Sequence, residues 1–189
     1  MEIQESTMVT TVTYSDDREM RYLLTKKWAD DLPKATIIML MPGSSGAVHQ
    51  DVTTGCIINC ISQLGFGSVD IVNLFSKVDA EISTDMKVTE LTNEENDKII
   101  LESVANSTTT ILAWGKCDET NIKIKKRVEA LLKMISPYKE KWFAIGDGRG
   151  RSGFSPMYPR IRNGWELVKL SKEEKENDNS SKRPKKVGK

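Results

Sequence analysis

Residues 35–43 read Ala-Thr-Ile-Ile-Met-Leu-Met-Pro-Gly, and this stretch decides the fold. Apart from Thr36, its first seven residues form a continuous apolar run, which Pro42 and Gly43 then end. An apolar run of this length is typical of a strand buried on both faces, as strands are in a parallel sheet. The sequence therefore predicts a central strand over residues 35–41, followed by a loop of small residues.

Three further segments are strand-like. They are residues 68–75 (SVDIVNLF), 108–114 (TTTILAW) and 141–145 (KWFAI), each rich in the β-branched and aromatic residues that strands favour. Between them, apolar residues recur at helical spacing over residues 51–65, 92–105 and 121–135. Strands that alternate with helices predict an α/β fold, namely a three-layer sandwich with a mostly parallel four-stranded central sheet and right-handed crossovers.

Two of the predicted helices carry start signals. Asp51 is a residue type that caps helices, and it comes directly before the apolar positions of the first helix. Thr92 is followed three residues later by Glu95, which is the spacing of a capping box. These signals fix where the first two helices are expected to begin.

The chain of 189 residues is long enough for one α/β domain, which we assign to residues 1–170. Residues 171–189 hold seven Lys or Arg against four Asp or Glu, with Val187 as the single aliphatic residue. Such a segment cannot bury enough apolar surface to offset its ordering entropy, so we expect a disordered charged tail. Its basic end, residues 182–186, is either an electrostatic aid to nucleic-acid binding or a solubilising terminus.

Composition narrows the class of protein. No apolar run approaches the length of a membrane span, and the amino terminus lacks a signal-peptide pattern, so we expect a cytoplasmic protein without membrane contact. Cys56, Cys60 and Cys117 form no CxxC pair, and His49 is the single histidine. These residues fit reduced thiols better than a zinc site, and we predict neither a metal nor a cofactor. The oligomeric state is open, with a monomer favoured.

In a parallel sheet, ligands bind beyond the carboxyl ends of the strands. The first predicted strand ends in Met41 and is followed by Pro42, Gly43 and Ser44, whose small side chains let a ligand approach the backbone. The loop lacks the Gly-Lys-Ser/Thr ending of a nucleotide triphosphate-binding loop.

Two titratable residues in the same loop each have two possible roles. Asp51 is either a general base that positions water or the N-cap of the next helix, and one carboxylate can serve as both. His49 is either a catalytic residue or an ordinary surface residue of the loop.

The second predicted strand ends in Asn73, whose carboxamide offers one donor and one acceptor, as the edge of a base requires. Asn73 is otherwise a turn former. Two strand-end aromatic residues, Phe75 and Trp114, are candidates for contact with the same ligand, although Phe75 is otherwise a core residue.

The loop after the fourth strand combines basic and aromatic residues. Gly148, Gly150 and Gly153 match G-x-G-x-x-G, but Pro156 follows where a dinucleotide-binding helix has to begin. Aromatic side chains can stack on bases and basic side chains can bind phosphates, so this loop has the residue types that nucleic-acid binding needs. The alternative is a solvated basic loop. The candidate nucleic-acid contacts are Arg149, Arg151, Ser152, Phe154, Tyr158 and Arg160.

Several motifs, taken in order, resemble one family. They are Arg21-Tyr22-x-Leu24, Met41-Pro42-Gly43-Ser44, Asp51 with Thr53, Asn73-Leu74-Phe75, Asn96-Asp97, Ala113-Trp114-Gly115 and Ser155-Pro156-Met157-Tyr158. This order and spacing resembles the prokaryotic and phage domain-of-unknown-function family numbered sixteen forty-three. That family's pattern reads Leu-Asn-Pro-Ser, Asp-x-Thr, Asn-Leu-Phe, Asn-Asp, Trp-Gly and His-Pro-Leu-Tyr. The resemblance spans residues 21–165.

The layout also resembles the uracil-DNA glycosylase superfamily, in which a proline-containing loop follows the first strand and a base-reading Asn ends the second. The resemblance implies that residues 41–43 form the water-positioning loop and that Asn73 reads the base. It further implies that Trp114 and Gly115 end the third strand and that residues 154–156 clasp flipped DNA. Two positions depart from the superfamily: Met41 stands where an Asp or Asn often activates water, and Ser155 stands where a histidine is usual.

By this resemblance the chemistry is base flipping and hydrolysis of an N-glycosidic bond in DNA, without a metal or cofactor. Asp51 is the implied carboxylate, and Ser155, Asn73 or His49 stabilises the leaving base. The small residues of the first loop suggest a modified or bulky base rather than uracil, and a role in phage defence or counter-defence. A catalytically inert nucleic-acid or nucleotide binding module and a small-molecule nucleoside hydrolase are the alternatives.

Overall fold

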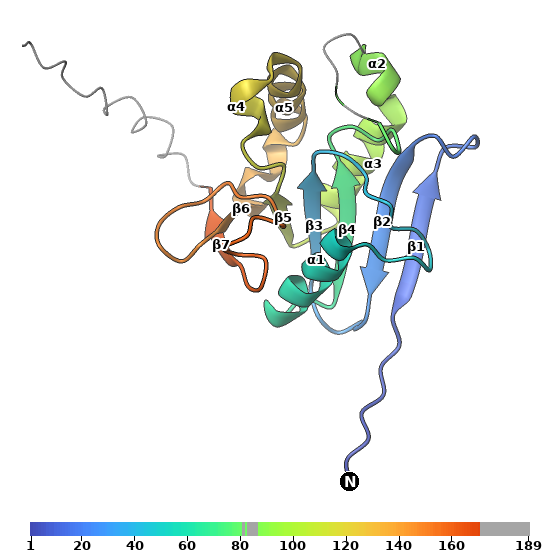
Figure 1. The fold of residues 1–189 in the computed structure, drawn as a ribbon, viewed down its shortest axis with the longest axis vertical. Helices are drawn as coiled ribbons and strands as arrows, with labels where there is room; N and C mark the ends of the chain where they lie inside the picture. Colours follow the sequence, from blue (N-terminus) through green and yellow to red (C-terminus); the bar gives the residue numbers. More distant parts are fainter. Residues whose placement is uncertain (81, 83–86, 171–189) are drawn as a thin grey trace, which may run out of the picture.

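A computed structural model describes residues 1–80, 82 and 87–170. These residues form one sheet of seven strands in the order β1-β2-β4-β3-β5-β6-β7 (Figure 1). The strands are β1 (Val9–Tyr14), β2 (Arg21–Lys27), β3 (Lys34–Met39), β4 (Ser68–Asn73), β5 (Thr109–Leu112), β6 (Trp142–Gly146) and β7 (Glu166–Lys169). β3 pairs in parallel with β4 and β5, and β5 pairs in parallel with β6. The other three pairings are antiparallel.

The α/β class is confirmed, but the predicted four-stranded, mostly parallel sheet is wrong. The four predicted strands are β3, β4, β5 and β6, which form the parallel centre of a larger sheet. The strands missed are β1, β2 and β7, which pair antiparallel at its flanks. β2 contains Arg21, Lys26 and Lys27, and β1 and β7 combine polar residues with half-buried or exposed ones, so none of the three is a continuous apolar run. A search for continuous apolar runs therefore overlooks such strands.

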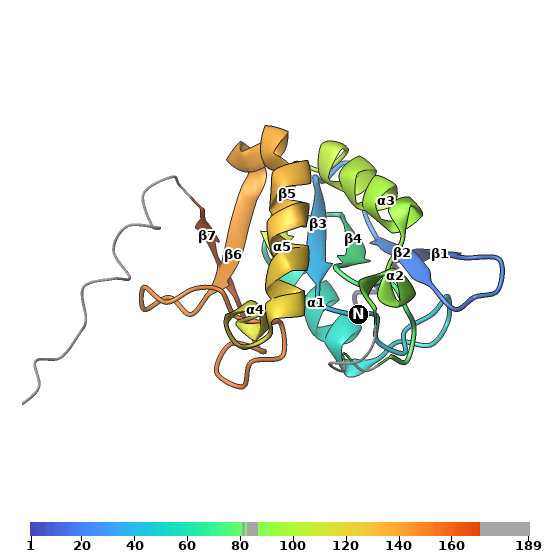
Figure 2. The same ribbon diagram turned by 90° about the horizontal axis from the view of Figure 1, so that it is seen from above.

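Helices cover both faces of the sheet. They are α1 (Val52–Gln63), α2 (Val88–Leu91), α3 (Glu94–Ala105), α4 (Cys117–Thr120), α5 (Ile122–Met134) and the short 3₁₀ helix η1 (Ser136–Lys141). Figure 2 shows α1 on one side of the sheet and α3 and α5 on the other. Two separate apolar cores result, one beneath α1 and one beneath α3 and α5. We call these sides the α1 face and the α3 face.

The two helix-start signals had different outcomes. Asp51 is the N-cap of α1, since its side chain accepts a hydrogen bond from the Thr54 backbone N–H at 2.7 Å. The predicted capping box at Thr92 is wrong, because the N-cap of α3 is Asn93. Thr92 instead accepts a hydrogen bond from the Asn96 side chain at 2.9 Å.

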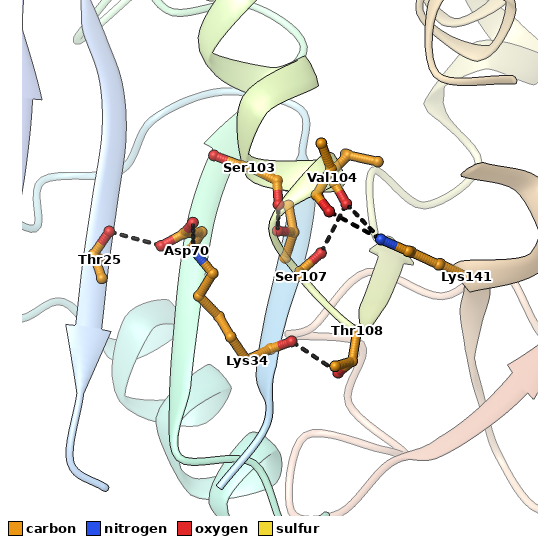
Figure 3. A network of polar contacts seen from close by, with 10 residues as sticks. Thr25, Lys34, Asp70, Ser103, Val104, Ser107, Thr108 and Lys141 are labelled. Carbon is orange, nitrogen blue, oxygen red and sulfur yellow. Dashed lines mark hydrogen bonds and ion pairs between the residues drawn. The ribbon is translucent and has the colours of Figure 1, made fainter. Parts of the chain in front are cut away.

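A polar network lies at the amino ends of the parallel strands, beside the end of α3 (Figure 3), where Thr36 Oγ1 of β3 donates to the Ser103 carbonyl of α3 at 2.9 Å. The buried Asp70 carboxylate accepts hydrogen bonds from Thr25 Oγ1 at 2.7 Å and from Lys34 Nζ at 2.8 Å. Lys141 Nζ donates to the carbonyl of Ala105 at 3.0 Å, at the last turn of α3. A cation at this position also interacts favourably with the helix dipole.

Several sequence expectations concern absences or the terminus. Among the described residues, no helix is long and apolar enough to cross a membrane. Within the same residues, no group of three or more His, Cys, Asp or Glu side chains could hold a metal ion. Cys56, Cys60 and Cys117 are free thiols. The predicted disordered tail, residues 171–189, lies outside the described residues.

Candidate functional site

The loop after β3 is held by a buried arginine. Arg21 is only 2% exposed, and its Nη1 donates to the carbonyls of Gly43 at 3.1 Å and Ser45 at 2.7 Å. Tyr14 pairs with Arg21 although Thr13 pairs with Leu23, so Tyr22 is an extra residue in β2. Such a bulge re-aims the side chains next to it. Here it directs Arg21 toward the loop after β3.

Asp51 lies in a closed hydrogen-bond ring with Ser45 and Thr54. Its Oδ1 accepts from the Thr54 N–H at 2.7 Å and its Oδ2 from the Ser45 N–H at 3.1 Å. Ser45 Oγ accepts from the Asp51 N–H at 2.8 Å and donates to Thr54 Oγ1 at 2.8 Å. Gly43 is required beside this ring, because a Cβ there would lie 2.4 Å from Asp51 Oδ2. The ring therefore fixes the carboxylate in one orientation.

The Asp51 carboxylate is held in its ionised form. Burial raises the pKa of Asp51, but the hydrogen bonds from Thr54 and Ser45 outweigh it, so the pKa lies below its usual value. An ionised carboxylate can orient a water molecule or stabilise a sugar cation. The N-cap role is confirmed, and the base role remains a prediction.

The other predicted residues of this loop vary in exposure. His49, Gly43 and Ser44 are exposed, and Met41 and Pro42 are half-buried. The backbone carbonyl of His49 accepts a hydrogen bond from the Gly46 N–H at 2.9 Å, which closes the loop on itself.

Asn73 is buried at the carboxyl end of β4 without a partner for its side chain. Val69 and Ile71 of the same strand belong to the core beneath α1, so the alternation of the strand places Asn73 on the α1 face. The residue is fully buried, and both Oδ1 and Nδ2 lack a hydrogen-bond partner among the described residues. Leaving a buried polar group unpaired costs about 1–3 kcal/mol.

No other described residue leaves two side-chain atoms in this state. Five residues leave one buried side-chain atom each without a partner: Arg21 Nε, Asn96 Oδ1, Thr110 Oγ1, Trp142 Nε1 and Trp165 Nε1. Asn73 alone leaves a complete donor and acceptor pair. Its carboxamide is therefore the group most in need of an outside partner.

The backbone around Asn73 is clamped from the α3 face. Asn96 Nδ2 donates to the Asn73 carbonyl at 3.0 Å, and Arg127 Nε donates to the Leu74 carbonyl at 2.8 Å. Arg127 also forms an ion pair with Asp97. The Asn96-Asp97 motif thus holds the end of β4 in two ways. Asn96 bonds to it directly, and Asp97 pairs with Arg127, which bonds to it. Arg127 was not a candidate from sequence, since a lone arginine in a basic helix gives no signal.

A hollow of about 640 Å³ lies between the loop after β5 and the loop that joins β6 to β7. We call this space the hollow. Its lining residues are Gly115, Lys116, Arg151, Ser152, Gly153, Phe154, Ser155 and Tyr158.

The hollow brings together most of the predicted nucleic-acid contacts. Arg151, Ser152, Phe154 and Tyr158 line it, together with Ser155. The rings of Phe154 and Tyr158 stack with centroids 4.6 Å apart and planes 23° apart. The remaining two candidates, Arg149 and Arg160, are exposed residues that do not line the hollow.

A tight turn carries the basic side of the hollow. Asp147 Oδ1 accepts from the backbone N–H of Arg149 at 3.0 Å and of Arg151 at 3.2 Å. Asp147 Oδ2 accepts from Arg151 Nε at 2.8 Å, which fixes the guanidinium. Gly148 and Gly150 have φ values of +69° and +82°, a conformation that side chains disfavour. These two glycines allow the chain to form this turn, so their spacing does not require a dinucleotide-binding site.

Two predicted substrate contacts are buried in the core instead. Phe75 is fully buried and Trp114 is 8% exposed, and both belong to the core beneath α3 and α5. The structure places Phe75 in its alternative core role. Both rings pack in this core beside the strand ends, and neither lines the hollow.

One protein family matches residues 21–157, and its description reads "Protein of unknown function (DUF1643)". The matched segment runs from Arg21, which holds the loop after β3, to the residues beside Ser155 in the hollow. No curated protein and no solved structure matches the chain.

Proposed function

The chain belongs to the family of proteins of unknown function DUF1643, and on that premise we propose that it is a DNA glycosylase-like enzyme. Its reaction would be hydrolysis of the N-glycosidic bond of a modified or non-canonical base in DNA, in phage defence or counter-defence. We also propose that the chain has the layout of the uracil-DNA glycosylase superfamily and that its partner is DNA.

The observation that carries the proposal is the unpaired carboxamide of Asn73. A buried amide with a free donor and a free acceptor is costly unless a ligand completes it. A base offers a matching acceptor and donor along its edge, and two hydrogen bonds of this kind discriminate between bases. Asn73 stands at the strand end where ligands of parallel sheets bind.

The remaining groups supply the chemistry of bond cleavage. A base is flipped out of the DNA, and Asn73 holds its edge. As the bond from the sugar to the base breaks, an oxocarbenium-like sugar cation forms and the electron pair leaves with the base. The ionised Asp51 stabilises this cation and orients the water that attacks it, and the proton that the water loses as the new C–O bond forms goes to the departing base anion. The exposed Gly43 and Ser44 leave room beside the base.

One observation favours the second candidate, an inert module that binds nucleic acid or a nucleotide. Both oxygens of Asp51 already accept backbone hydrogen bonds at the start of α1. Hydrogen bonds of this kind lower basicity, and Met41 and Ser155 add no carboxylate or imidazole to the site. The residues that bind a base would then remain without the residues that cleave its bond.

The test is base release from DNA that carries uracil, hypoxanthine or modified cytosines, including phage genomic DNA, followed by alkali to cut at abasic sites. Asn73→Leu removes the amide, and Asp51→Asn removes the charge while keeping a helix-capping side chain. Asn59→Ala, at an exposed position of α1, is the matched control. Loss of release in both site variants and not in the control supports the enzyme.

No release from any substrate, with DNA binding retained, would instead support the binding module. A free nucleoside tested alongside separates a third outcome, because its hydrolysis without any action on DNA would identify a small-molecule enzyme.

A further inference from the structure

Asn73 and the hollow lie at two separate places along the carboxyl edge of the sheet. Asn73 ends β4, whereas Gly115 and Lys116 follow β5, and β3 runs between these strands. Neighbouring strands lie about 4.8 Å apart, so β4 and β5 are roughly 10 Å apart at this edge. Asn73 is not among the residues that line the hollow. A ligand that uses both places must therefore be longer than one base.

The aromatic wall of the hollow has the form of a stacking platform. Phe154 is the inner ring, 9% exposed and packed in the core beneath α1. Tyr158 stacks on it and is 37% exposed. The inner ring fixes the plane of the outer one, so Tyr158 presents a supported aromatic surface at the wall. Stacking on such surfaces is how proteins hold single-stranded bases without regard to sequence.

Two cations border the same space. The Arg151 guanidinium is fixed by Asp147, and Lys116 forms a solvent-exposed ion pair with Glu119 at 3.3 Å. Exposed pairs of this kind contribute little and exchange easily for another anion. The volume of about 640 Å³ is in the range of sites that hold small organic ligands. A ring platform with cations beside it suits a base and its phosphate.

We propose that the hollow binds one unstacked nucleotide of the strand whose modified base is read at Asn73, so that the substrate is single-stranded DNA. This inference rests on the proposed function. In a duplex, successive bases of one strand rise by about 3.4 Å. At that spacing each base is covered on both faces by its neighbours, so a base that stacks on Tyr158 has lost a neighbouring base on that face, and the strand has lost its regular stacking there.

The test measures binding of the full chain to a fluorescent oligothymidylate and to a hairpin duplex, by anisotropy. We expect tighter binding of the single strand, and a loss of roughly 5- to 100-fold for Tyr158→Ala. Tyr158→Phe keeps the ring and the affinity. Tyr138→Ala, in η1, is the matched control. Tyr158→Leu, with a thermal melt of each variant, separates loss of the ring from loss of folding.

Equal affinity for the two DNAs, or an unchanged affinity in folded Tyr158→Ala, would overturn the inference. Thymidine monophosphate that competes as well as the oligonucleotide would overturn the claim of a strand and indicate a free nucleotide. Base release together with a Tyr158-independent affinity would refute the hollow and leave the proposed function intact. A preference for single-stranded DNA that depends on Tyr158, without any base release, would support the hollow and refute the proposed function.

Discussion

Asp70 and Asn73 lie three residues apart on β4, and both are almost completely buried. Asp70 faces α3 and pairs with Thr25 and Lys34, as Figure 3 shows. Asn73 faces α1 and its side chain pairs with nothing among the described residues. Burial of a polar group therefore does not by itself indicate function. A polar group that is buried and left unpaired is the stronger indication of function, because it destabilises the folded protein and nothing within the fold compensates for that.

The largest effect is expected at Asp70. Asp70→Ala should destabilise the fold by about 3 kcal/mol, because it removes a buried carboxylate that accepts hydrogen bonds from Thr25 and from the half-exposed Lys34. Asp30→Ala, which removes the partner of Lys27 at the surface, should change stability by less than about 1 kcal/mol. Urea unfolding measures both. An Asp70→Ala protein as stable as wild type would show that the paired end of β4 is not structural.

Arg127 should have the next largest effect, since it clamps the carbonyl beside Asn73. Arg127→Met leaves the Leu74 carbonyl without its donor and should cost about 2 kcal/mol. Lys126→Met, at an exposed neighbouring position on α5, is the control. Thermal or urea unfolding is the measurement, and equal stability of the two variants would remove the clamp from the description of this strand end.

Asn73 should behave in the opposite sense to Asp70. Asn73→Leu replaces an unpaired amide by an apolar group of similar shape, and we expect stability to be unchanged or raised by about 1–2 kcal/mol. The measurement is the same urea titration, with Asn59→Ala as the reference for an exposed Asn. A destabilisation as large as that of Asp70→Ala would mean that the amide has a structural partner after all.

Asp51 should give the smallest and a pH-dependent effect. The folded pKa of Asp51 is lowered, so its contribution is complete above the unfolded pKa of about 4 and is lost as the pH falls through the folded pKa. Asp51→Asn should therefore cost about 1 kcal/mol at pH 7, and the difference from wild type should shrink below about pH 4. Unfolding curves between pH 7 and pH 3 test this. A difference that is constant over the range would contradict it.

The predictable part of the fold was its parallel centre. The central strand was predicted over residues 35–41 and is β3, Lys34–Met39, so only its ends differ. It is apolar because both of its faces are covered, and this property is visible in the sequence alone. The antiparallel strands β1 and β7 each have a free edge and a half-buried pattern, so their segments resemble loops. Asp51 as a cap was also predictable, because a cap acts on neighbours three residues away.

The site was predictable only where it follows strand ends. Asn73 and the aromatic pair of the hollow were found in this way. The role of Arg21 depends on a bulge that one extra residue creates, and the role of Arg127 depends on a contact between residues 53 positions apart. Local patterns carry no record of such long-range contacts. The false capping box at Thr92 has a local cause instead, because the neighbouring Asn93 caps α3 and the Thr92 hydroxyl accepts a hydrogen bond from the Asn96 side chain four residues away.

The most direct test is the rate of base release by Asn73→Leu relative to wild type, on whichever DNA substrate wild type cleaves, with the folded fraction of both measured. We predict a loss of about 10²- to 10³-fold, since removal of one positioned hydrogen-bonding group in an active site has that effect. The loss should occur in a protein at least as stable as wild type. Release at the wild-type rate by Asn73→Leu would contradict the assignment of Asn73 as the base-reading residue.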